Sequence, residues 1–155
     1  KSSAGKQYKL WQEAKHAKAF ELLKTEEAAK VAEKLGLKKK AFEAPECLKC
    51  HTTAFGVDKK HLGDKFSLEE GVTCEACHGA GEFFGKPEDG KVHKEAFEKG
   101  YMTPDEALCR SCHNEKSPTW DPERDTTKDG KKVGFDFEAR WKEVRHPIPK
   151  PEDKK

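Results

Sequence analysis

The sequence CLKCH at residues 47–51 is repeated as CEACH at 74–78 and as CRSCH at 109–113. These three copies contain all six cysteines of the 155-residue chain. C-x-x-C-H is the attachment signal for c-type haem, because its two thiols form thioethers with the porphyrin and the adjacent imidazole becomes the proximal iron ligand. We therefore expect three c-type haems. The expected attachment residues are Cys47, Cys50, Cys74, Cys77, Cys109 and Cys112, and the expected proximal ligands are His51, His78 and His113.

Three other kinds of site use cysteines at similar spacings. A disulfide scaffold does not require a histidine after every second cysteine. A redox C-x-x-C motif occurs once, in a βαβ pattern that this sequence lacks. A zinc site built from the pairs at 47–50 and 74–77 is the strongest alternative. It leaves the third cysteine pair without a partner and three histidines unexplained, so the repeat favours haem.

The composition is too polar for an ordinary globular core. Only 34% of the residues are hydrophobic and 39% are charged, with a mean hydropathy of −1.01. Such a chain buries too little apolar surface to offset its conformational entropy, unless porphyrin faces provide the interior at about 25 cal/mol per Å². We expect a single all-α domain over residues 1–155, with short helices and long loops wrapped around closely packed haems. Little or no β-sheet is expected, and the tail from about residue 147 is polar.

The charge pattern limits the possible partners and locations. The 31 Lys and Arg are interspersed with 29 Asp and Glu, so no basic stripe for nucleic acid is present. No apolar run is long enough to cross a membrane. The chain begins at Lys1 rather than Met, as a mature form does after removal of an export signal. We therefore expect a periplasmic or extracellular location.

Periodicity and capping signals predict the positions of the helices. The predicted helices cover Gln7–Leu23, the segment from Thr25 to Gly36, Val92–Lys99, a segment launched by a capping box at residues 103–106 that carries the third C-x-x-C-H, and a last helix that ends near His146. Residues 114–134 are predicted to form a loop.

Four further histidines compete for the distal iron positions: His16, His61, His93 and His146. Met102 is the only methionine, so at most one haem can have His/Met ligation, and bis-histidine ligation is expected. His61 follows three charged residues, where a solvent-facing side chain is typical. We expect His16, His93 and His146 to be the distal ligands.

Local sequence supports those three distal ligands. His16 shares a helix face with Phe20 and Leu23, and His93 precedes Phe97 by one helical turn. His146 follows an amphipathic helix and precedes a proline. Four histidines for three irons leave one over. That histidine is exposed, or it ligates a haem in a neighbouring subunit, or one iron lacks a histidine opposite its proximal ligand.

Four segments resemble multihaem cytochromes of the cytochrome c-554 type. They are YKLWQEAKHAKAFELL at 8–23, GVTCEACHGAGE at 71–82, CRSCHNEKSPTW at 109–120 and FDFEARWKEVRHP at 135–147. The resemblance implies an all-α fold organised by packed haems, export from the cytoplasm and electron transfer between redox partners. It also implies that His16 and His146 are distal ligands.

The chain departs from the family pattern in three places. Members carry a further C-x-x-C-H before the segment that resembles residues 8–23, and only seven residues precede Tyr8 here. We therefore expect the first haem site of the family to be missing. Ala14 stands where the family has Ser, and Ala80 where it has Pro. One family haem is five-coordinate, and the residues leave open whether one of these three shares that property.

The leading functional hypothesis is a trihaem electron-transfer protein between a redox donor and a redox acceptor outside the cytoplasm, not an enzyme. One alternative is a reductase of a small nitrogen or sulfur oxyanion, or of nitric oxide, at a haem with an open axial position. Another is a subunit of a larger multihaem assembly, with the extra histidine reaching across the contact.

Overall fold

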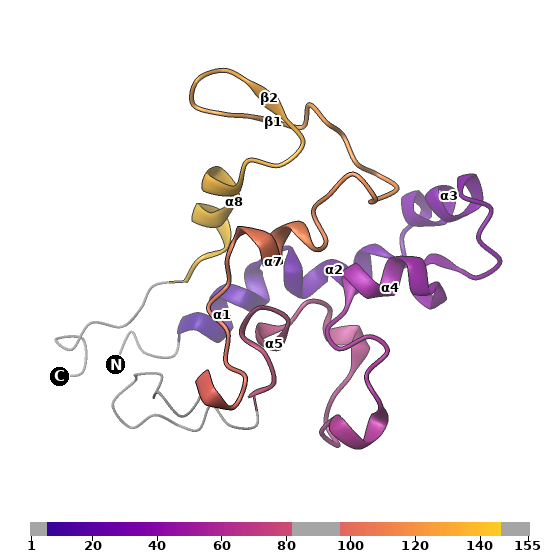
Figure 1. Cartoon of the computed structure of the whole chain (residues 1–155). Helices are drawn as coiled ribbons and strands as arrows, with labels where there is room; N and C mark the ends of the chain where they lie inside the picture. Colours follow the sequence, from indigo (N-terminus) through magenta and orange to yellow (C-terminus); the bar gives the residue numbers. More distant parts are fainter. Residues whose placement is uncertain (1–5, 82–96, 147–155) are drawn as a thin grey trace, which may run out of the picture.

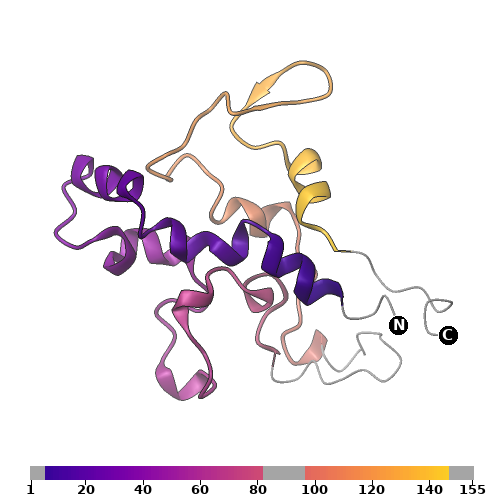
Figure 2. The ribbon, with the colours of Figure 1, turned by 180° about the vertical axis from the view of Figure 1, so that it is seen from behind.

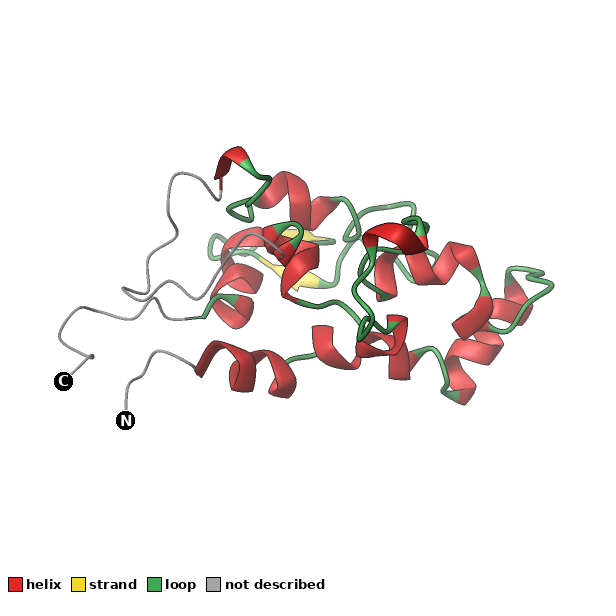
Figure 3. Ribbon diagram, turned by 90° about the horizontal axis from the view of Figure 1, so that it is seen from below, coloured by secondary structure: helices red, strands yellow, loops and turns green. Residues whose placement is uncertain are grey.

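The computed structural model describes residues 6–81 and 97–146, and these are almost entirely helices, turns and loops (Figures 1 and 3). The α-helices whose two ends lie within the described residues are α1 (Lys6–Glu13), α2 (Ala19–Leu22), α3 (Glu26–Lys34), α4 (Pro45–His51), α5 (Cys74–His78), α7 (Glu106–Arg110) and α8 (Phe137–Val144). Single 3₁₀ turns, labelled η, lie at His16–Lys18 (η1), Ala41–Glu43 (η2), Lys59–His61 (η3) and Leu68–Glu70 (η4). The two-residue strands β1 (Asp125–Thr126) and β2 (Lys132–Val133) form one antiparallel hairpin. The expected all-α class is confirmed.

The predicted continuous helix over Gln7–Leu23 is wrong, because it is interrupted around His16. Helix α1 ends at Glu13, η1 follows, and α2 begins only at Ala19. The His16 carbonyl accepts a hydrogen bond from the Val72 N–H at 3.0 Å, so it is engaged by a distant segment at the point where the helix would continue. A tertiary contact has overridden local helix propensity.

The second helix is capped as predicted and leads into the small core. The Thr25 hydroxyl accepts a hydrogen bond from the Ala28 N–H at 3.2 Å at the start of α3. Gly36, directly after the helix end, has a φ of +66°, which glycine adopts without strain. Helix α3 then packs against the turn η2, which precedes α4.

The protein interior is small. Within residues 6–81 and 97–146, the buried hydrophobic residues are Phe20, Leu23, Ala32, Ala41, Ala44, Leu48 and Phe135. Three of these are alanines, and no large side chain in those ranges is less than 2% exposed. Most of them gather where α2, α3, η2 and α4 meet (Figure 2). This limited core agrees with the polar composition.

The start of α7 differs from the predicted capping box. Asp105, not Thr103, is the N-cap, and its carboxylate accepts a hydrogen bond from the Leu108 N–H at 2.8 Å. The helix ends at Arg110, so Cys112 and His113 lie in the turn that follows rather than in the helix itself. Asp is a strong N-cap when its backbone is extended, as it is here, and this moves the helix start two residues along the chain.

The last helix and its surroundings agree in part with the prediction. The segment 114–134 is largely loop, but it contains the β1–β2 hairpin. Helix α8 is capped by Asp136 and ends at Val144, two residues before His146, because Arg145 already has an extended backbone. The predicted helix Val92–Lys99 lies outside the described residues except at 97–99, and the polar tail lies entirely outside them. No helix of the described part is long and apolar enough to cross a membrane.

Candidate haem-binding site

The three C-x-x-C-H copies lie on short helical segments. The first is contained in α4, the second forms the whole of α5, and the third begins in α7 and continues into a turn. Cysteines three residues apart lie on one side of a helical turn, which two porphyrin vinyl groups require. All six cysteines are free thiols, so the disulfide alternative finds no support.

The thiols of different copies lie near one another. Burial raises the pKa of Cys50 to about 11, and the adjacent Cys112 thiol adds to this rise. Burial also raises the pKa of Cys77, and the nearby Cys109 thiol contributes next. Three attachment segments that are far apart in the sequence therefore converge on one region of the protein.

Two of the three predicted proximal histidines are oriented by backbone carbonyls. The Nδ1 atom of His51 lies 2.9 Å from the Ala19 carbonyl oxygen, and Nδ1 of His78 lies 3.1 Å from that of Met102. A carbonyl can only accept, so Nδ1 carries the proton in both rings and Nε2 is left as the basic nitrogen. Metal-ligating histidines almost always donate their other ring N–H in this way.

The third proximal histidine is oriented by an aromatic ring. His113 stacks on Phe135 with 4.9 Å between ring centroids and 6° between the ring planes. Burial lowers the pKa of His113, with repulsion from His16 as the next contribution, and burial also lowers the pKa of His16. Burial therefore favours the neutral form of both imidazoles, which is the form that a metal ligand needs.

Two predicted distal histidines lie opposite two proximal ones. The ring centroids of His16 and His113 are 6.1 Å apart, with 65° between their planes. Those of His78 and His146 are 5.9 Å apart, with 50° between their planes. Metal–imidazole bonds of about 2 Å on each side of one ion place two ring centroids about 6 Å apart. Both pairs therefore have the spacing of two axial ligands of one iron, and the residues present fit a haem.

The remaining predicted ligands are not brought together by the described residues. His93 lies outside them, so its role stays a prediction. His61 is exposed on η3, and its ring contacts no other histidine of residues 6–81 and 97–146. Met102 contacts His78 through its backbone, since its N–H donates to the His78 carbonyl at 2.9 Å. No three His, Cys, Asp or Glu side chains form a metal-binding group within residues 6–81 and 97–146, so the four-cysteine zinc site is not assembled.

Two glycines that sequence reasoning passed over allow chain segments to approach the histidines. Gly71 has a φ of +74°, and a Cβ there would lie 2.8 Å from the His16 carbonyl oxygen. Gly79, next to His78, has a φ of +79°, and a Cβ there would overlap the Gly100 carbonyl oxygen. The sequence shows a glycine directly after the second C-x-x-C-H, which marks this position as one where another segment can come close. It does not show which segment that is.

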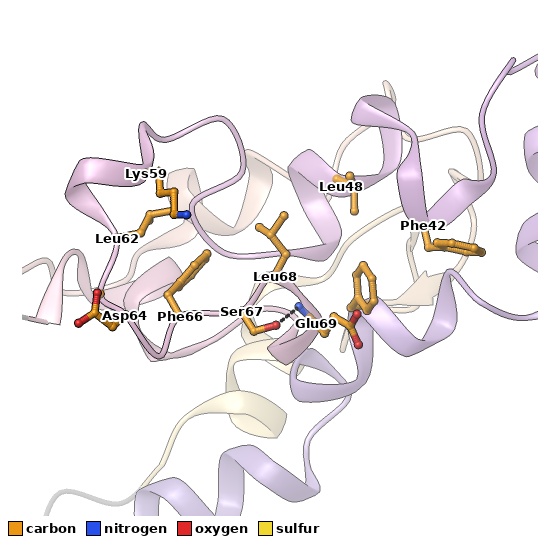
Figure 4. Close-up of a pocket in the computed structure, with 11 residues that line it drawn as sticks. Phe42, Leu48, Lys59, Leu62, Asp64, Phe66, Ser67, Leu68 and Glu69 are labelled. Carbon is orange, nitrogen blue, oxygen red and sulfur yellow. Dashed lines mark hydrogen bonds between the residues drawn. The ribbon is translucent and has the colours of Figure 1, made fainter.

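An open hollow of about 780 Å³ lies beside α4 and the segment 59–69 (Figure 4). Leu48 of α4, Phe66 and Leu68 provide much of its apolar lining, and Lys59 and Glu69 contribute charged groups. No cysteine or histidine lines it. The hollow is therefore a neighbour of the first attachment helix and not part of the ligand sets.

Comparison with known proteins agrees with this geometry. Residues 4–79 match the family model described as cytochrome c554 and c-prime. The curated cytochrome c-554 of Nitrosomonas europaea is 31% identical over 166 residues, covering 90% of this chain and 68% of that protein. The chain belongs to the cytochrome c-554 family. As a cytochrome c-554 family member it is a c-type cytochrome, for which c-type haem and an electron-transfer role follow. No solved structure gives a significant match.

Proposed function

We propose that this chain is a trihaem c-type cytochrome that transfers electrons between redox partners outside the cytoplasm and is not itself an enzyme. The observation that carries this proposal is the spacing of the two histidine pairs, 6.1 Å and 5.9 Å between ring centroids. Each pair joins a histidine of a C-x-x-C-H copy to a histidine from a distant segment. Such pairs provide two strong axial ligands and leave no position for a substrate.

The proposed ligand sets follow from those pairs. His113 is opposite His16, and His78 is opposite His146. His51 is the proximal ligand of the third haem, and His93 is proposed as the remaining distal ligand. Bis-histidine ligation gives a lower reduction potential than His/Met ligation.

The haems supply one-electron chemistry at iron, and the chain supplies attachment, orientation and proximity. The carbonyl oxygens of Ala19 and Met102 hold two imidazole rings in a single tautomer. The neighbouring thiols of Cys50 and Cys112, and of Cys77 and Cys109, place the attachment points close together. We propose a single domain over residues 1–155 in which no haem is isolated from the others.

The haem count and the ligation are tested together on protein matured in an exporting host. Intact mass is expected to equal the polypeptide plus three haems, and EPR during a redox titration is expected to show low-spin ferric signals. A mass equal to the bare polypeptide, or to the polypeptide plus zinc, would contradict the proposal.

The reductase alternative predicts a different spectroscopic result. A haem with an open axial position gives a high-spin ferric signal and binds CO after reduction. We expect the two haems with paired histidines to bind no CO. Turnover of nitrite, sulfite or nitric oxide with an artificial electron donor would favour the enzyme.

Partners and location are tested in the native cell. Transfer proteins of this kind form weak complexes with small interfaces. We expect the protein in the periplasmic or extracellular fraction, and a single-chain mass in size exclusion. A larger homogeneous species would favour the assembly alternative, and recovery from the cytoplasm would contradict export.

A further inference from the structure

Asp125 is a buried carboxylate in the β1–β2 hairpin, and three separate groups bind it. Its side chain is 4% exposed. It accepts hydrogen bonds from the Asp136 backbone N–H at 2.9 Å and from Arg140 Nε at 3.1 Å, with a second contact to the Arg140 guanidinium. Arg124 Nε lies 3.4 Å away. A buried charge is tolerated only when it is paired and hydrogen-bonded, so these partners have defined positions around it.

One hydrogen-bond donor to Asp125 lies next to Phe135, the residue that stacks on the proposed proximal ligand His113. The Asp136 N–H belongs to the peptide that follows Phe135, and Phe135 is 6% exposed and stacked on His113. The guanidinium of Arg110 lies 5.4 Å from the Phe135 ring centroid, and that of Arg124 lies 5.9 Å from it. Phe135 is therefore contacted on several sides, and its ring plane is nearly parallel to that of His113.

The Trp120 side chain holds the same turn from another side. A Cβ at Gly134 would overlap the Trp120 ring, so the indole lies directly against the backbone before Phe135. This contact and the Asp125 hydrogen bond act on neighbouring peptides of one short segment.

A second hydrogen-bond donor to Asp125 is Arg140, which lies in the helix that precedes the proposed distal histidine His146. Arg140 lies in α8, and this helix ends at Val144, two residues before His146. The Arg140 side chain reaches back to Asp125, and α8 lies next to the hairpin in both ribbon views (Figures 1 and 2). Arg140 also binds the exposed Glu143 at 3.0 Å, within the same helix. Unlike the Glu143 contact, the bond to Asp125 joins α8 to the hairpin.

We infer that Asp125 is a positioning residue that sets the ligand geometry of two haems at once. Through Phe135 it fixes the ring plane of His113, and through Arg140 it fixes the approach of His146 to the iron bound by His78. This role rests on the proposed ligand sets. Second-shell groups of this kind orient metal ligands and tune the metal.

The Asp125→Asn variant of the three-haem protein tests this role. Asn keeps the shape of the side chain and removes its charge. The g values of a low-spin ferric haem depend on the angle between its two imidazole planes, now 65° for His16 and His113. We expect those g values to shift, and the fraction of high-spin haem at the His78–His146 site to rise roughly tenfold, as loss of one charge-assisted hydrogen bond implies.

Glu143→Gln is the matched control. It removes the other carboxylate on Arg140, which is 56% exposed and binds within one helix. We expect its EPR spectrum to equal that of the wild type. The wild-type signals are assigned beforehand with His16→Ala and His146→Ala. A purely structural ion pair would lower the melting temperature of Asp125→Asn and leave the EPR signals unchanged, and that result would overturn the inference.

Two further variants decide the question if Asp125→Asn does not fold. One changes only the connection through Phe135, and the other changes only the connection through Arg140. Phe135→Leu is expected to change only the signal of the His16–His113 haem. Arg140→Lys keeps the charge but loses the two-pronged contact, and is expected to change only the signal of the His78–His146 haem. Unchanged signals, or the same haem affected by both variants, would overturn the inference. A wild-type protein without low-spin signals would instead contradict the proposed function.

Discussion

At the residue scale, the proposed distal ligand His16 and the exposed His61 differ in their surroundings. His16 is half-buried and its ring centroid lies 6.1 Å from that of His113, whereas His61 is exposed on η3. We expect His16→Ala to convert one haem to a high-spin form that binds CO after reduction, because one iron loses its sixth ligand. Optical and EPR spectra measure this change.

His61→Ala is the control for the ligand variants. It removes an imidazole of the same size from a charged surface turn, and we expect spectra identical to those of the wild type. A high-spin haem in His61→Ala, together with wild-type spectra in His16→Ala, would show that His61 and not His16 is the distal ligand.

The stability contribution of Asp125 has a defined pH dependence. Hydrogen bonds from Arg140 hold the pKa of Asp125 well below its usual range, and those from the Asp136 N–H and Arg124 add to this effect. A group whose pKa is depressed by folding stabilises the protein above its unfolded pKa, about 3.9, and this stabilisation is lost as the pH falls toward the folded pKa.

We therefore expect Asp125→Asn to lower the free energy of unfolding by about 2 kcal/mol at neutral pH. This is less than a fully buried ion pair gives, because Arg140 is 34% exposed. Denaturant unfolding between about pH 3 and pH 7 measures the difference, which is expected to shrink below about pH 4. A difference that grows in acid would contradict this account.

At the element scale, the contact between residues 71–72 and the turn η1 explains why the first predicted helix is interrupted. Gly71 has both a positive φ and a carbonyl oxygen where a Cβ would lie, whereas Gly36 has a positive φ with open space around it. An alanine at either position is strained by the positive φ, which glycine adopts readily.

We expect Gly71→Ala to be clearly more destabilising than Gly36→Ala, because the His16 carbonyl must also move. The low-spin signal of the His16–His113 haem is expected to change only in Gly71→Ala. Unfolding midpoints and EPR spectra of the two variants make the comparison, and equal losses would show that the close contact is unimportant.

Helix starts were predictable where the cap lies beside the helix that it serves. Thr25 was recognised as the N-cap of α3 because its hydroxyl bonds to a backbone N–H three residues later. The start of α7 was misplaced by two residues, since Thr103 and Asp105 are both capping residues and only the backbone conformation selects one of them.

At the scale of the whole molecule, the small apolar core predicts that folding depends on haem. Three of the seven buried hydrophobic residues in the described part are alanines. We expect the haem-free chain to be largely unfolded, with weak far-UV circular dichroism and no cooperative melting transition, because its side chains alone cannot offset the chain entropy. The three-haem protein melted under the same conditions is the control, and a compact apoprotein that melts cooperatively would contradict this prediction.

The sequence by itself determined the fold class and predicted the attachment chemistry. The two thiols and the imidazole of each C-x-x-C-H copy are placed by one helical turn, so their spacing can be read without the fold, and the polar composition already required an added apolar interior. Only the tertiary structure decided that the His16 ring lies 6.1 Å from that of His113, and the His146 ring 5.9 Å from that of His78, between centroids. These pairs, the interruption at η1 and the partners of Asp125 join segments far apart in the chain, and contacts of that kind depend on how elements pack rather than on any local pattern.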